Sequence, residues 1–471
     1  MEERLSRWLL LPLLLALLFL FILYQYAAPG GSCPSAPAAA VPAPAASPPC
    51  GSGFSSAAAA AAPFARGGQL ARRRQQHQHR EPPFFGAASG LGLRLPATSG
   101  GGSGHKFLFG LSELCRRVHF DMRGHDVMVF LHIQKTGGTT FGRHLVRNIR
   151  LEQPCFCRTG QKKCTCHRPG GAGAAAAGGG DESAGGGGGD KGDTWLFSRF
   201  STGWSCGLHA DWTELTSCVP AAMDRRGGCP ANRTRRNFYY ITMLRDPVSR
   251  YLSEWKHVQR GATWKTSLHM CDGRSPTREE LPMCYLGDDW SGVSLQEFMN
   301  CGHNLANNRQ VRMLADLSLV GCYNLTFMNE SERNTILLQS AKNNLKNMAF
   351  FGLTEFQRKT QYLFERTFNL EFISPFTQYN ITRASNVDIS ESVRKRIEEL
   401  NFLDMQLYEY AKDLFLQRFQ YAKLEEHEQN RQKRREERKI LRVQKIQEWE
   451  KEDEIEEIAV TEDYNSQVER W

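Results

Sequence analysis

The stretch DVMVFLHIQKTGGTTFGRHLV, residues 126–146, decides the fold of this 471-residue chain. Residues 127–133 are mainly apolar and rich in β-branched and aromatic side chains, a run that suits one buried strand and is too short for an ordinary helix. Residues 134–140 then supply one lysine, two glycines and three threonines, and apolar residues recur at helical spacing from Phe141 onward. The stretch therefore predicts a strand, a glycine-rich loop and the start of a helix.

A strand, a glycine-rich loop and a helix start in this order form an anion-binding site. The first N–H groups of a helix have no partner inside the helix, the helix dipole adds partial positive charge there, and glycines let the backbone approach a phosphate. Lys135 precedes the glycines, whereas the P-loop of nucleotide hydrolases ends in Gly-Lys-Ser/Thr. We therefore predict a phosphate-binding loop that is related to that P-loop but distinct from it.

A second strand and helix follow the same plan. Residues 238–244 (FYYITML) predict a strand, Asp246 suits a helix N-cap, and Pro247 suits the first helical position. Arg245 should then lie at the carboxyl end of the strand, with Ser253 farther along the helix. If the two strands are parallel neighbours, both junctions lie at one edge of the sheet, and they could hold two phosphates of one ligand.

A third region combines cations with aromatic residues. Residues 195–212 (WLFSRFSTGWSCGLHADW) contain Arg199, Trp204 and His209, and Lys162 and Lys163 precede them. Such a mixture suits an anionic sugar. The residues alone leave two interpretations of His209 open, a catalytic base or a satisfied histidine in an aromatic core between Trp204 and Trp212. The histidines that compete for the catalytic role are His132, His257, His269 and His303.

Three segments together resemble the heparan-sulfate 6-O-sulfotransferases. They are residues 132–140 (HIQKTGGTT), 245–255 (RDPVSRYLSEW) and 351–360 (FGLTEFQRKT). The resemblance covers about residues 106–420. It implies a P-loop-like α/β sulfotransferase fold with a central, mainly parallel sheet.

The same resemblance implies a reaction. A sulfuryl group would pass from 3′-phosphoadenylyl sulfate, the co-substrate, to the 6-hydroxyl of N-sulfoglucosamine residues in heparan sulfate, with no metal required. His209 would act as the general base, and its unperturbed pKa near 6.5 would suit a mildly acidic to neutral lumen. Lys135 would stabilise charge on the leaving phosphate.

The resemblance also assigns binding residues. Those implied for the donor are His132, Ile133, Gln134, Lys135, Thr136, Gly137, Gly138, Thr139, Thr140, Arg245, Ser253, Thr377, Gln378, Tyr379, Arg383 and Ala384. Those implied for the acceptor saccharide are Lys162, Lys163, Arg199, Trp204, His209, His257 and Trp264. Without the resemblance, His257 and Trp264 could equally be buried helix contacts.

The N-terminal sequence predicts membrane attachment. Residues 8–24 are apolar and uncharged, and Arg4 and Arg7 before them favour a cytoplasmic N-terminus. A cleaved signal peptide is the alternative, but no cleavage motif follows the run directly. We therefore expect a cytoplasmic tail (1–7), a transmembrane signal-anchor (8–28) and a lumenal body, and with the resemblance a single-pass type II protein of the Golgi membrane.

Cysteines and glycosylation motifs agree with a lumenal body. Twelve of the fourteen cysteines lie between Cys115 and Cys322, and sequons occur at Asn232, Asn324, Asn329 and Asn380. A cluster of possible zinc ligands comprises Cys155, Cys157, Cys164, Cys166 and His167. Its CxC spacing and the oxidising compartment favour disulfides over zinc, and the connectivity stays open.

Composition divides the remainder of the chain. Residues 29–105 are rich in Ala, Pro, Gly and Ser and predict a flexible stem, and residues 168–192 predict a disordered insertion within a sulfotransferase domain at 106–420. Apolar residues at helical spacing predict an amphipathic helix over 393–414. Residues 421–471 predict a charged helical tail, solvated rather than a long coiled coil.

Other functions stay in view. The rivals are a sulfotransferase for another position or another glycosaminoglycan, a lumenal nucleotide-dependent kinase, and a non-catalytic heparan-binding membrane protein. A kinase or hydrolase should show the Gly-Lys-Ser/Thr ending and an acidic residue for Mg²⁺. We expect heparan sulfate and the membrane as partners and no nucleic acid, and the sequence leaves the oligomeric state open.

Overall fold

The centre of the protein is a four-stranded sheet. The computed structural model describes residues 105–169, 194–226, 236–376 and 387–468. In the sheet, β1 (Val127–Leu131) pairs with β2 (Leu196–Phe197) and with β3 (Phe238–Leu244), and β4 (Phe350–Leu353) lies beside β3. All three pairings are parallel, which confirms the predicted sheet.

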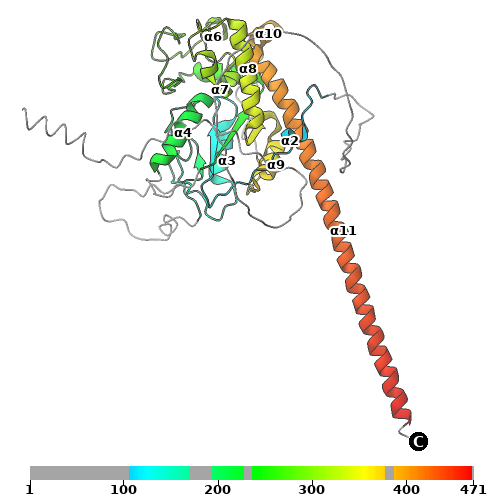
Figure 1. Cartoon of the computed structure of the whole chain (residues 1–471). Helices are drawn as coiled ribbons and strands as arrows, with labels where there is room; N and C mark the ends of the chain where they lie inside the picture. The colour runs from blue at the N-terminus through cyan, green and yellow to red at the C-terminus, as the bar shows by residue number, and fades with distance from the viewer. Residues whose placement is uncertain (1–104, 170–193, 227–235, 377–386, 469–471) are drawn as a thin grey trace, which may run out of the picture. The chain divides into compact units, whose positions relative to one another are not determined.

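Helices connect and flank these strands (Figure 1). The α-helices are α2 (Leu111–Leu114), α3 (Gly138–Arg147), α4 (Trp212–Arg226), α5 (Pro247–Val258), α6 (Leu295–Asn300), α7 (Arg309–Leu314), α8 (Glu330–Asn347), α9 (Gln357–Phe368), α10 (Glu391–Leu400) and α11 (Phe402–Val468). Two short 3₁₀ turns, η2 (Leu317–Val320) and η3 (Thr354–Phe356), complete the described elements.

The register of the sheet brings three strands to a common carboxyl edge. Leu131 pairs with Thr242, and Leu244 pairs with Leu353. The buried Thr242 hydroxyl donates to the Leu131 carbonyl over 2.8 Å, which ties β3 to the end of β1. All five β1 side chains are buried, as a strand covered on both faces requires.

The β3–α5 junction follows the predicted capping chemistry. Asp246 is the N-cap, its Oδ1 accepts from the Ser249 N–H over 2.8 Å, and Pro247 is the first helical residue. Arg245 consequently lies between the end of β3 and the start of α5, as expected.

The prediction of one continuous helix over residues 393–414 is wrong, because the chain breaks the helix near its middle. Asn401 separates α10 from α11, and its φ and ψ of −119° and 28° are not helical. The buried Asn401 amide donates to the Ile397 carbonyl over 2.8 Å and accepts from the Asn308 N–H over 3.2 Å. One bond to the preceding helix and one to the chain-distant Asn308 backbone thus override the apolar periodicity.

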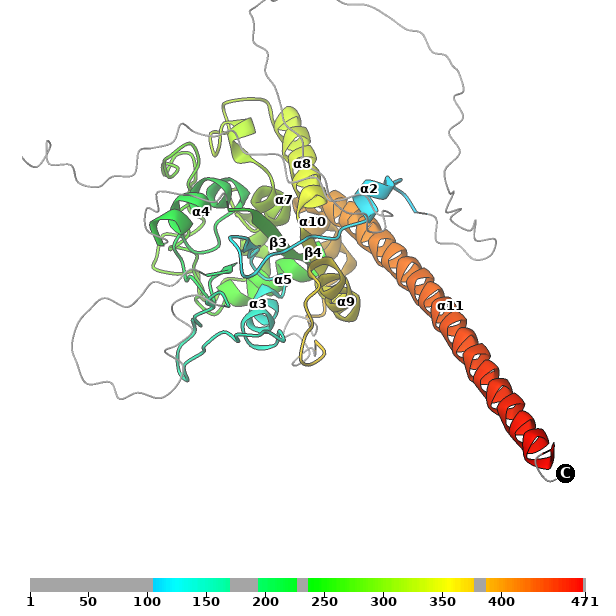
Figure 2. The same cartoon turned by 60° about the horizontal axis from the view of Figure 1, so that its bottom comes forward.

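The last helix packs on the domain over only its first part. Tyr362 contacts Glu426 at 3.0 Å, and Arg366 donates to Gln429 over 3.3 Å. From residue 430 to residue 452 every side chain is exposed, while α11 continues (Figure 2). The structure therefore contains the charged helix that the tail sequence predicted.

Disulfides replace the zinc alternative. The bridges among the described residues are Cys155–Cys166, Cys157–Cys164, Cys206–Cys218, Cys271–Cys322 and Cys284–Cys301. The first two consume all four thiols of the CxC cluster, so that cluster offers no thiolate to a metal. They close a small hairpin in which Phe156 and Thr165 pair.

Several expectations fall outside the described residues. These are the predicted anchor (8–28), nearly all of the stem, Asn232, Asn380 and the donor segment that includes Thr377, Gln378, Tyr379, Arg383 and Ala384. Among the described helices, none combines the length and apolar character needed to cross a bilayer. Arg168, at the edge of the predicted insertion, is buried and donates to the Met122 and Thr194 carbonyls, each over 3.2 Å.

Candidate active site

The glycine-rich loop connects β1 to α3 at the carboxyl edge of the sheet. Lys135 and Gly137 both have positive φ, 66° and 78°, and α3 begins at Gly138. The buried Thr136 hydroxyl donates to the Ile133 carbonyl over 3.0 Å. A non-glycine residue in the left-handed region is strained, and such strain concentrates at ligand-binding sites. The backbone therefore forms the predicted turn into a helix N-terminus.

Glycine is required where the loop meets the helix. A Cβ on Gly138 would lie 2.3 Å from Cδ2 of His132, and a Cβ on Gly137 would lie 3.2 Å from the Thr354 hydroxyl oxygen. That hydroxyl lies 2.6 Å from the Thr136 carbonyl oxygen and 3.0 Å from the Leu244 carbonyl oxygen. The loop is thus fastened to the ends of β3 and β4.

The second predicted phosphate site, at Arg245, lies next to the first, at the Lys135 loop. The Arg245 guanidinium donates to the Lys135 carbonyl over 3.3 Å, and its backbone N–H donates to Gln310 over 3.0 Å. Burial lowers the pKa of Arg245, against the opposing effect of the Glu355 carboxylate. Ser253 is half-buried, farther along α5. The structure therefore brings Arg245 and Lys135 together, as the sequence predicted.

His209 lies beside the same loop. Its Nδ1 is 2.8 Å from the His132 carbonyl oxygen, and the two imidazole rings are 4.6 Å apart. Because a carbonyl oxygen can only accept, Nδ1 of His209 carries the proton, and Nε2 is left as an acceptor in the neutral ring. This geometry gives His209 the tautomer of a general base.

The pKa of His209 is not the unperturbed value expected from sequence. Burial lowers it to about 4, the His132 carbonyl opposes the shift, and Arg199 adds to it. Burial also holds the pKa of His132 well below its usual value, with His209 contributing. The His209 imidazole is therefore neutral in a mildly acidic or neutral solution.

His209 is not held between the two tryptophans of its own segment. Trp204 is 54% exposed, and Trp212 packs on Tyr240 with ring centroids 5.0 Å apart. Besides the His132 ring, His209 contacts the Trp264 ring edge-on, with ring centroids 5.3 Å apart. The interpretation of His209 as a histidine between Trp204 and Trp212 is therefore wrong.

Among the rival histidines, His257 and His132 lie near this site. His257 lies 5.6 Å from the Trp264 ring, and burial lowers the pKa of His257 to about 4, with Lys135 contributing. His269 instead contacts the Tyr323 hydroxyl at 3.2 Å, and His303 is exposed.

A buried carboxylate that sequence reasoning missed supports this site. Glu254 forms ion pairs with Arg250 and Arg309 and accepts from the Trp264 indole N–H over 3.2 Å. Burial alone would raise the pKa of Glu254, but Arg309 and Arg250 hold it at about 2. The i,i+4 spacing of Arg250 and Glu254 was visible in the sequence, whereas Arg309 is 55 residues from Glu254.

The cationic residues predicted for the acceptor occupy neighbouring segments. Lys162 and Lys163 are exposed, and Lys163 lies next to Gly203 in the loop before His209. The Arg199 guanidinium lies 5.3 Å from the Phe200 ring centre. The hairpin that carries the lysines is fastened to this loop by the Cys164 N–H, which donates to the Phe200 carbonyl over 2.7 Å.

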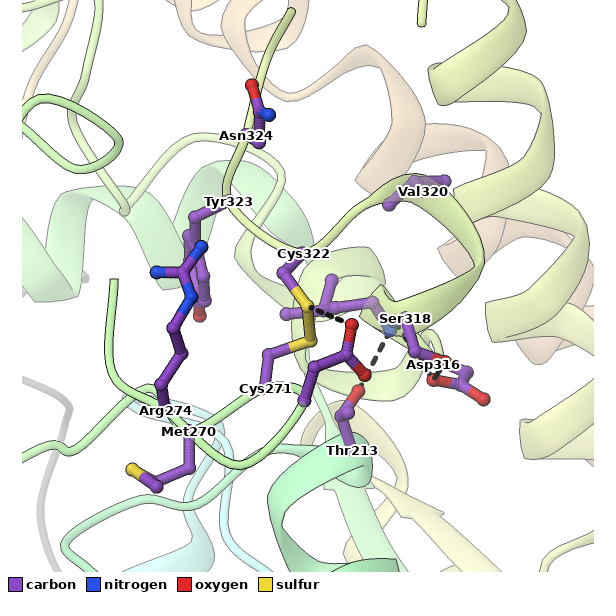
Figure 3. The surroundings of a disulfide bond; sticks show 12 residues. Thr213, Met270, Cys271, Arg274, Asp316, Ser318, Val320, Cys322, Tyr323 and Asn324 are labelled. Atoms are coloured by element: carbon purple, nitrogen blue, oxygen red, sulfur yellow. Dashed lines mark hydrogen bonds between the residues drawn. A yellow bond between two sulfur atoms is a disulfide. The ribbon is translucent and has the colours of Figure 1, made fainter. Parts of the chain in front are cut away.

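One other cluster contains residue types that can bind a metal, but its two sulfur atoms are not available as ligands. Asp272 lies 3.4 Å from Sγ of Cys322 and close to Cys271. The two cysteines form the disulfide that Figure 3 shows. Both sulfurs belong to one disulfide, so neither is a thiolate. The carboxylate alone gives no metal site.

A parallel sheet with a glycine-rich loop and an imidazole at its carboxyl edge is typical of a P-loop-like α/β protein that binds an anionic ligand at this edge. Residues 118–411, more than half of the chain, match the model of the sulfotransferase family. The chain is 64% identical to heparan-sulfate 6-O-sulfotransferase 3 of Mus musculus over the whole length of both chains. It is 74% identical to heparan-sulfate 6-O-sulfotransferase 3 of Homo sapiens over 78% of this chain and 74% of the relative. It is 68% identical to heparan-sulfate 6-O-sulfotransferase 3-B of Danio rerio over 78% of this chain and 82% of the relative.

The chain therefore belongs to the sulfotransferase family and, within it, to the heparan-sulfate 6-O-sulfotransferases. The match that spans both chains completely supports isoform 3. The resemblance seen in the three sequence motifs is confirmed.

Proposed function

We propose that this protein transfers a sulfuryl group from 3′-phosphoadenylyl sulfate to the 6-hydroxyl of N-sulfoglucosamine residues in heparan sulfate. The observation that carries the proposal is the meeting of His209, the Lys135 loop and Arg245 at one edge of the sheet. The names of the relatives supply the polymer and the position. They also disfavour the kinase and the non-catalytic binding protein.

The loop fits the phosphates of the donor. Lys135 and the residues from Thr136 to Thr140 form the loop and the first turn of α3, where partial positive charge accumulates. A Cβ at Gly138 would overlap the His132 ring, so only glycine lets the loop pack against His132 at this point. Arg245 and Ser253 would hold the 3′-phosphate. The remaining donor contacts that we propose are His132, Ile133, Gln134, Gly137, Thr377, Gln378, Tyr379, Arg383 and Ala384.

The reaction is a displacement at sulfur in which the residues position groups and stabilise charge. The acceptor oxygen forms a new S–O bond while the bond to the bridging phosphate oxygen breaks, and 3′,5′-ADP is released. The hydroxyl proton passes to Nε2 of His209. Lys135 stabilises the negative charge that builds on the leaving phosphate. No step in this scheme requires a metal.

The acceptor lies on the other side of His209 from its bond to His132. Trp264, which lies beside His209, would offer a ring face to the sugar. The Glu254 carboxylate holds the Trp264 indole in place through a hydrogen bond. The cations that would pair with carboxylate and sulfate groups are Lys162, Lys163 and Arg199, and Trp204 and His257 would complete the contacts. The pKa of His209 near 4 makes it a weak base, so its catalysis depends on positioning.

The proposal also covers the cellular location and the membrane orientation of the protein. A lumenal, type II orientation in the Golgi membrane agrees with the disulfides and with two sequons on the described surface. Asn329 is exposed at the start of α8, and Asn324 is half-buried. These two, with Asn232 and Asn380, are the proposed glycosylation sites.

The test compares two histidine variants. His209→Ala should lose about 10² to 10⁴ in transfer rate, the usual contribution of a general base, while keeping its melting temperature and its affinity for 3′,5′-ADP. His269→Ala, which changes a histidine bonded to Tyr323, should retain transfer. Labelled donor, desulfated heparan sulfate and disaccharide analysis give rate and position together. Parallel loss of nucleotide binding and activity in His209→Ala would reject the catalytic role, with His257 the next candidate, and sulfate at another position would reject the 6-hydroxyl.

A further inference from the structure

The exposed part of α11 carries a row of cations on one face. Arg431, Arg435, Arg438, Arg442 and Lys445 follow one another at intervals of four, three, four and three residues, and all are exposed. At about 100° of rotation per residue, these five side chains fall within an arc of about 80°. The row is about 21 Å long at a rise of about 1.5 Å per residue. We call these five residues the cationic stripe.

The stripe does not stabilise the helix that carries it. Within the described part of the chain, Arg435, Arg438, Arg442 and Lys445 form no ion pair, and only Arg431 approaches a carboxylate, Glu428 at 3.6 Å. Like charges three or four residues apart destabilise a helix by about 0.2 to 0.5 kcal/mol per pair. Such an arrangement is unfavourable unless an anion lies along it.

The acidic residues of this segment avoid the stripe. Glu436 and Glu437 lie on other faces of the helix, and Glu436 pairs with Lys439, also off the stripe, at 2.9 Å. Beyond Lys445 the sequence becomes strongly acidic over residues 448–457. The charge reversal gives the cationic face a defined end.

The apolar residues nearby do not provide a different binding mode. Ile440, Leu441, Val443 and Ile446 are 51% to 57% exposed. By helical position they point over more than half of the circumference, so they form neither a coiled-coil seam nor a membrane-facing stripe. Trp449 lies four residues after Lys445 on the cationic face and is 64% exposed. An aromatic ring in line with cations suits a sugar polymer.

We propose that the cationic stripe is a second binding site for a sulfated polysaccharide chain, separate from the site that holds the reacting sugar. The identity of the chain as heparan sulfate rests on the proposed function. One cation per helical turn matches an anionic polymer with regularly repeated charge, and Arg pairs well with planar carboxylates and with oxyanions. A chain held at two places binds more tightly than at either alone. The stripe should therefore strengthen the binding of long acceptor chains and leave the binding of short ones unchanged.

The experiment uses the full chain and two variants of equal charge. The stripe variant is Arg438→Gln with Arg442→Gln, and the control is Lys433→Gln with Lys439→Gln, which removes two cations from other faces of the same segment. Gln keeps a high helix propensity in both. KM is measured with long heparan sulfate chains and with an oligosaccharide too short to reach beyond the catalytic site, and retention on immobilised heparan sulfate is measured against salt.

The stripe variant should raise KM for long chains by about tenfold, leave KM for the oligosaccharide unchanged, and elute from the polysaccharide at lower salt. The control should resemble the parent protein. Equal effects of the two variants would show that only net charge matters and would overturn the proposal. Unchanged KM and retention would also overturn it, as would a selective loss of binding to vesicles of anionic lipid.

The two proposals fail in different ways. If the parent protein transfers no sulfate to the oligosaccharide, the proposed function fails, whereas retention on heparan sulfate still tests the stripe. If transfer to the oligosaccharide is normal and long chains behave alike in all three proteins, only the stripe fails.

Discussion

Lys135 combines strained backbone with a perturbed side chain. Its φ is 66°, and burial lowers the pKa of its ammonium group, an effect that Glu254 opposes and Arg260 reinforces. A cation that is partly stripped of water interacts more strongly with charge that develops nearby. Lys135 is thus suited to act on the transition state more than on bound donor.

Lys135→Ala should abolish measurable transfer with little change in the melting temperature. The reason is that an interaction made mainly in the transition state lowers kcat more than it changes KM. Steady-state kinetics and a thermal melt on the same preparation check this. Lys395→Ala, at an exposed lysine of α10 outside the proposed site, is the comparison, because it should keep kcat. Near-normal turnover of folded Lys135→Ala would remove Lys135 from the mechanism.

Arg245 should distinguish nucleotides by their 3′-phosphate. Arg245→Ala should weaken binding of 3′,5′-ADP by about 1.5 to 3 kcal/mol, the range for a hydrogen bond to a charged group. Binding of the nucleotide that lacks the 3′-phosphate should change far less. Calorimetric titration of both ligands decides the matter, and equal losses would place Arg245 away from that phosphate.

Single residues were predictable where local chemistry fixed their place. Lys135 and Arg245 come shortly after two predicted strands, so their meeting at the sheet edge could be expected if those strands were parallel neighbours, as they are. Glu254 could not be recognised in the same way, because its partners Arg309 and Trp264 reach it through tertiary packing. The pKa of His209 was missed for the same reason, since burial by chain-distant residues lowers it.

At the scale of elements, α4 is capped by the residues that follow the candidate base. Asp211 Oδ1 accepts from the Glu214 N–H over 3.0 Å, and Glu214 Oε2 accepts from the Asp211 N–H over 3.1 Å. The other Glu214 oxygen accepts from the Met270 N–H over 2.9 Å. This pair of carboxyl groups therefore holds the end of the His209 segment against the loop that follows Trp264.

The capping pair should make stability depend on pH. Burial raises the pKa of Glu214 to about 7, with Asp211 adding to the shift, and burial raises the pKa of Asp211 to about 6. Glu214 in the folded protein thus keeps its proton to higher pH than the unfolded chain, whose carboxyl titrates near 4.5. The stability it contributes is complete below about pH 4.5 and is lost as pH rises through about 7.

Glu214→Gln should flatten this dependence. The variant should lose less stability than the parent between pH 5 and pH 8, by about 1 to 3 kcal/mol, since one pKa unit corresponds to about 1.4 kcal/mol. Urea unfolding at the two pH values measures the difference. Glu332→Gln, an exposed residue in the first turn of α8, is the matched control and should behave like the parent. An unchanged slope in Glu214→Gln would show that this carboxyl titrates normally.

Local capping signals predicted α5 correctly, whereas the break between α10 and α11 was missed. Asp246 and Pro247 cap and start α5 with their own side chain and ring, so the sequence contains the whole signal. Asn401 interrupts the helix through a hydrogen bond to Asn308, 93 residues away. Apolar periodicity reports which face is buried and does not report such a bond.

At the scale of the whole molecule, α11 has two parts with different roles. Its first turns are core, since Leu403, Leu407 and Leu414 are at most 4% exposed. Arg418 donates to the Glu113 and Lys346 carbonyls, each over 2.9 Å, and so joins α2, α8 and α11. Composition suggested a boundary near residue 421. Among the side chains that the structure describes, the last hydrogen bond between α11 and the domain is the one that Gln429 accepts from Arg366.

Two truncations should separate these parts. A chain that ends at Gln429 should keep its melting temperature, its affinity for 3′,5′-ADP and its kcat on a short oligosaccharide, because it retains all the residues of α11 that are buried among its described side chains. A chain that ends at Lys412 loses Leu414 and Phe415, which are fully buried, together with Arg418. The two apolar side chains alone contribute about 3 to 6 kcal/mol. A domain is stable by only about 5 to 15 kcal/mol, so the shorter chain should unfold far below the melting temperature of the parent or fail to accumulate.

Thermal melts, nucleotide titration and transfer to the oligosaccharide are measured on both chains. Loss of nucleotide binding in the chain ending at Gln429 would show that the exposed helix supports the fold, and a stable, active chain ending at Lys412 would show that α11 does not belong to the core.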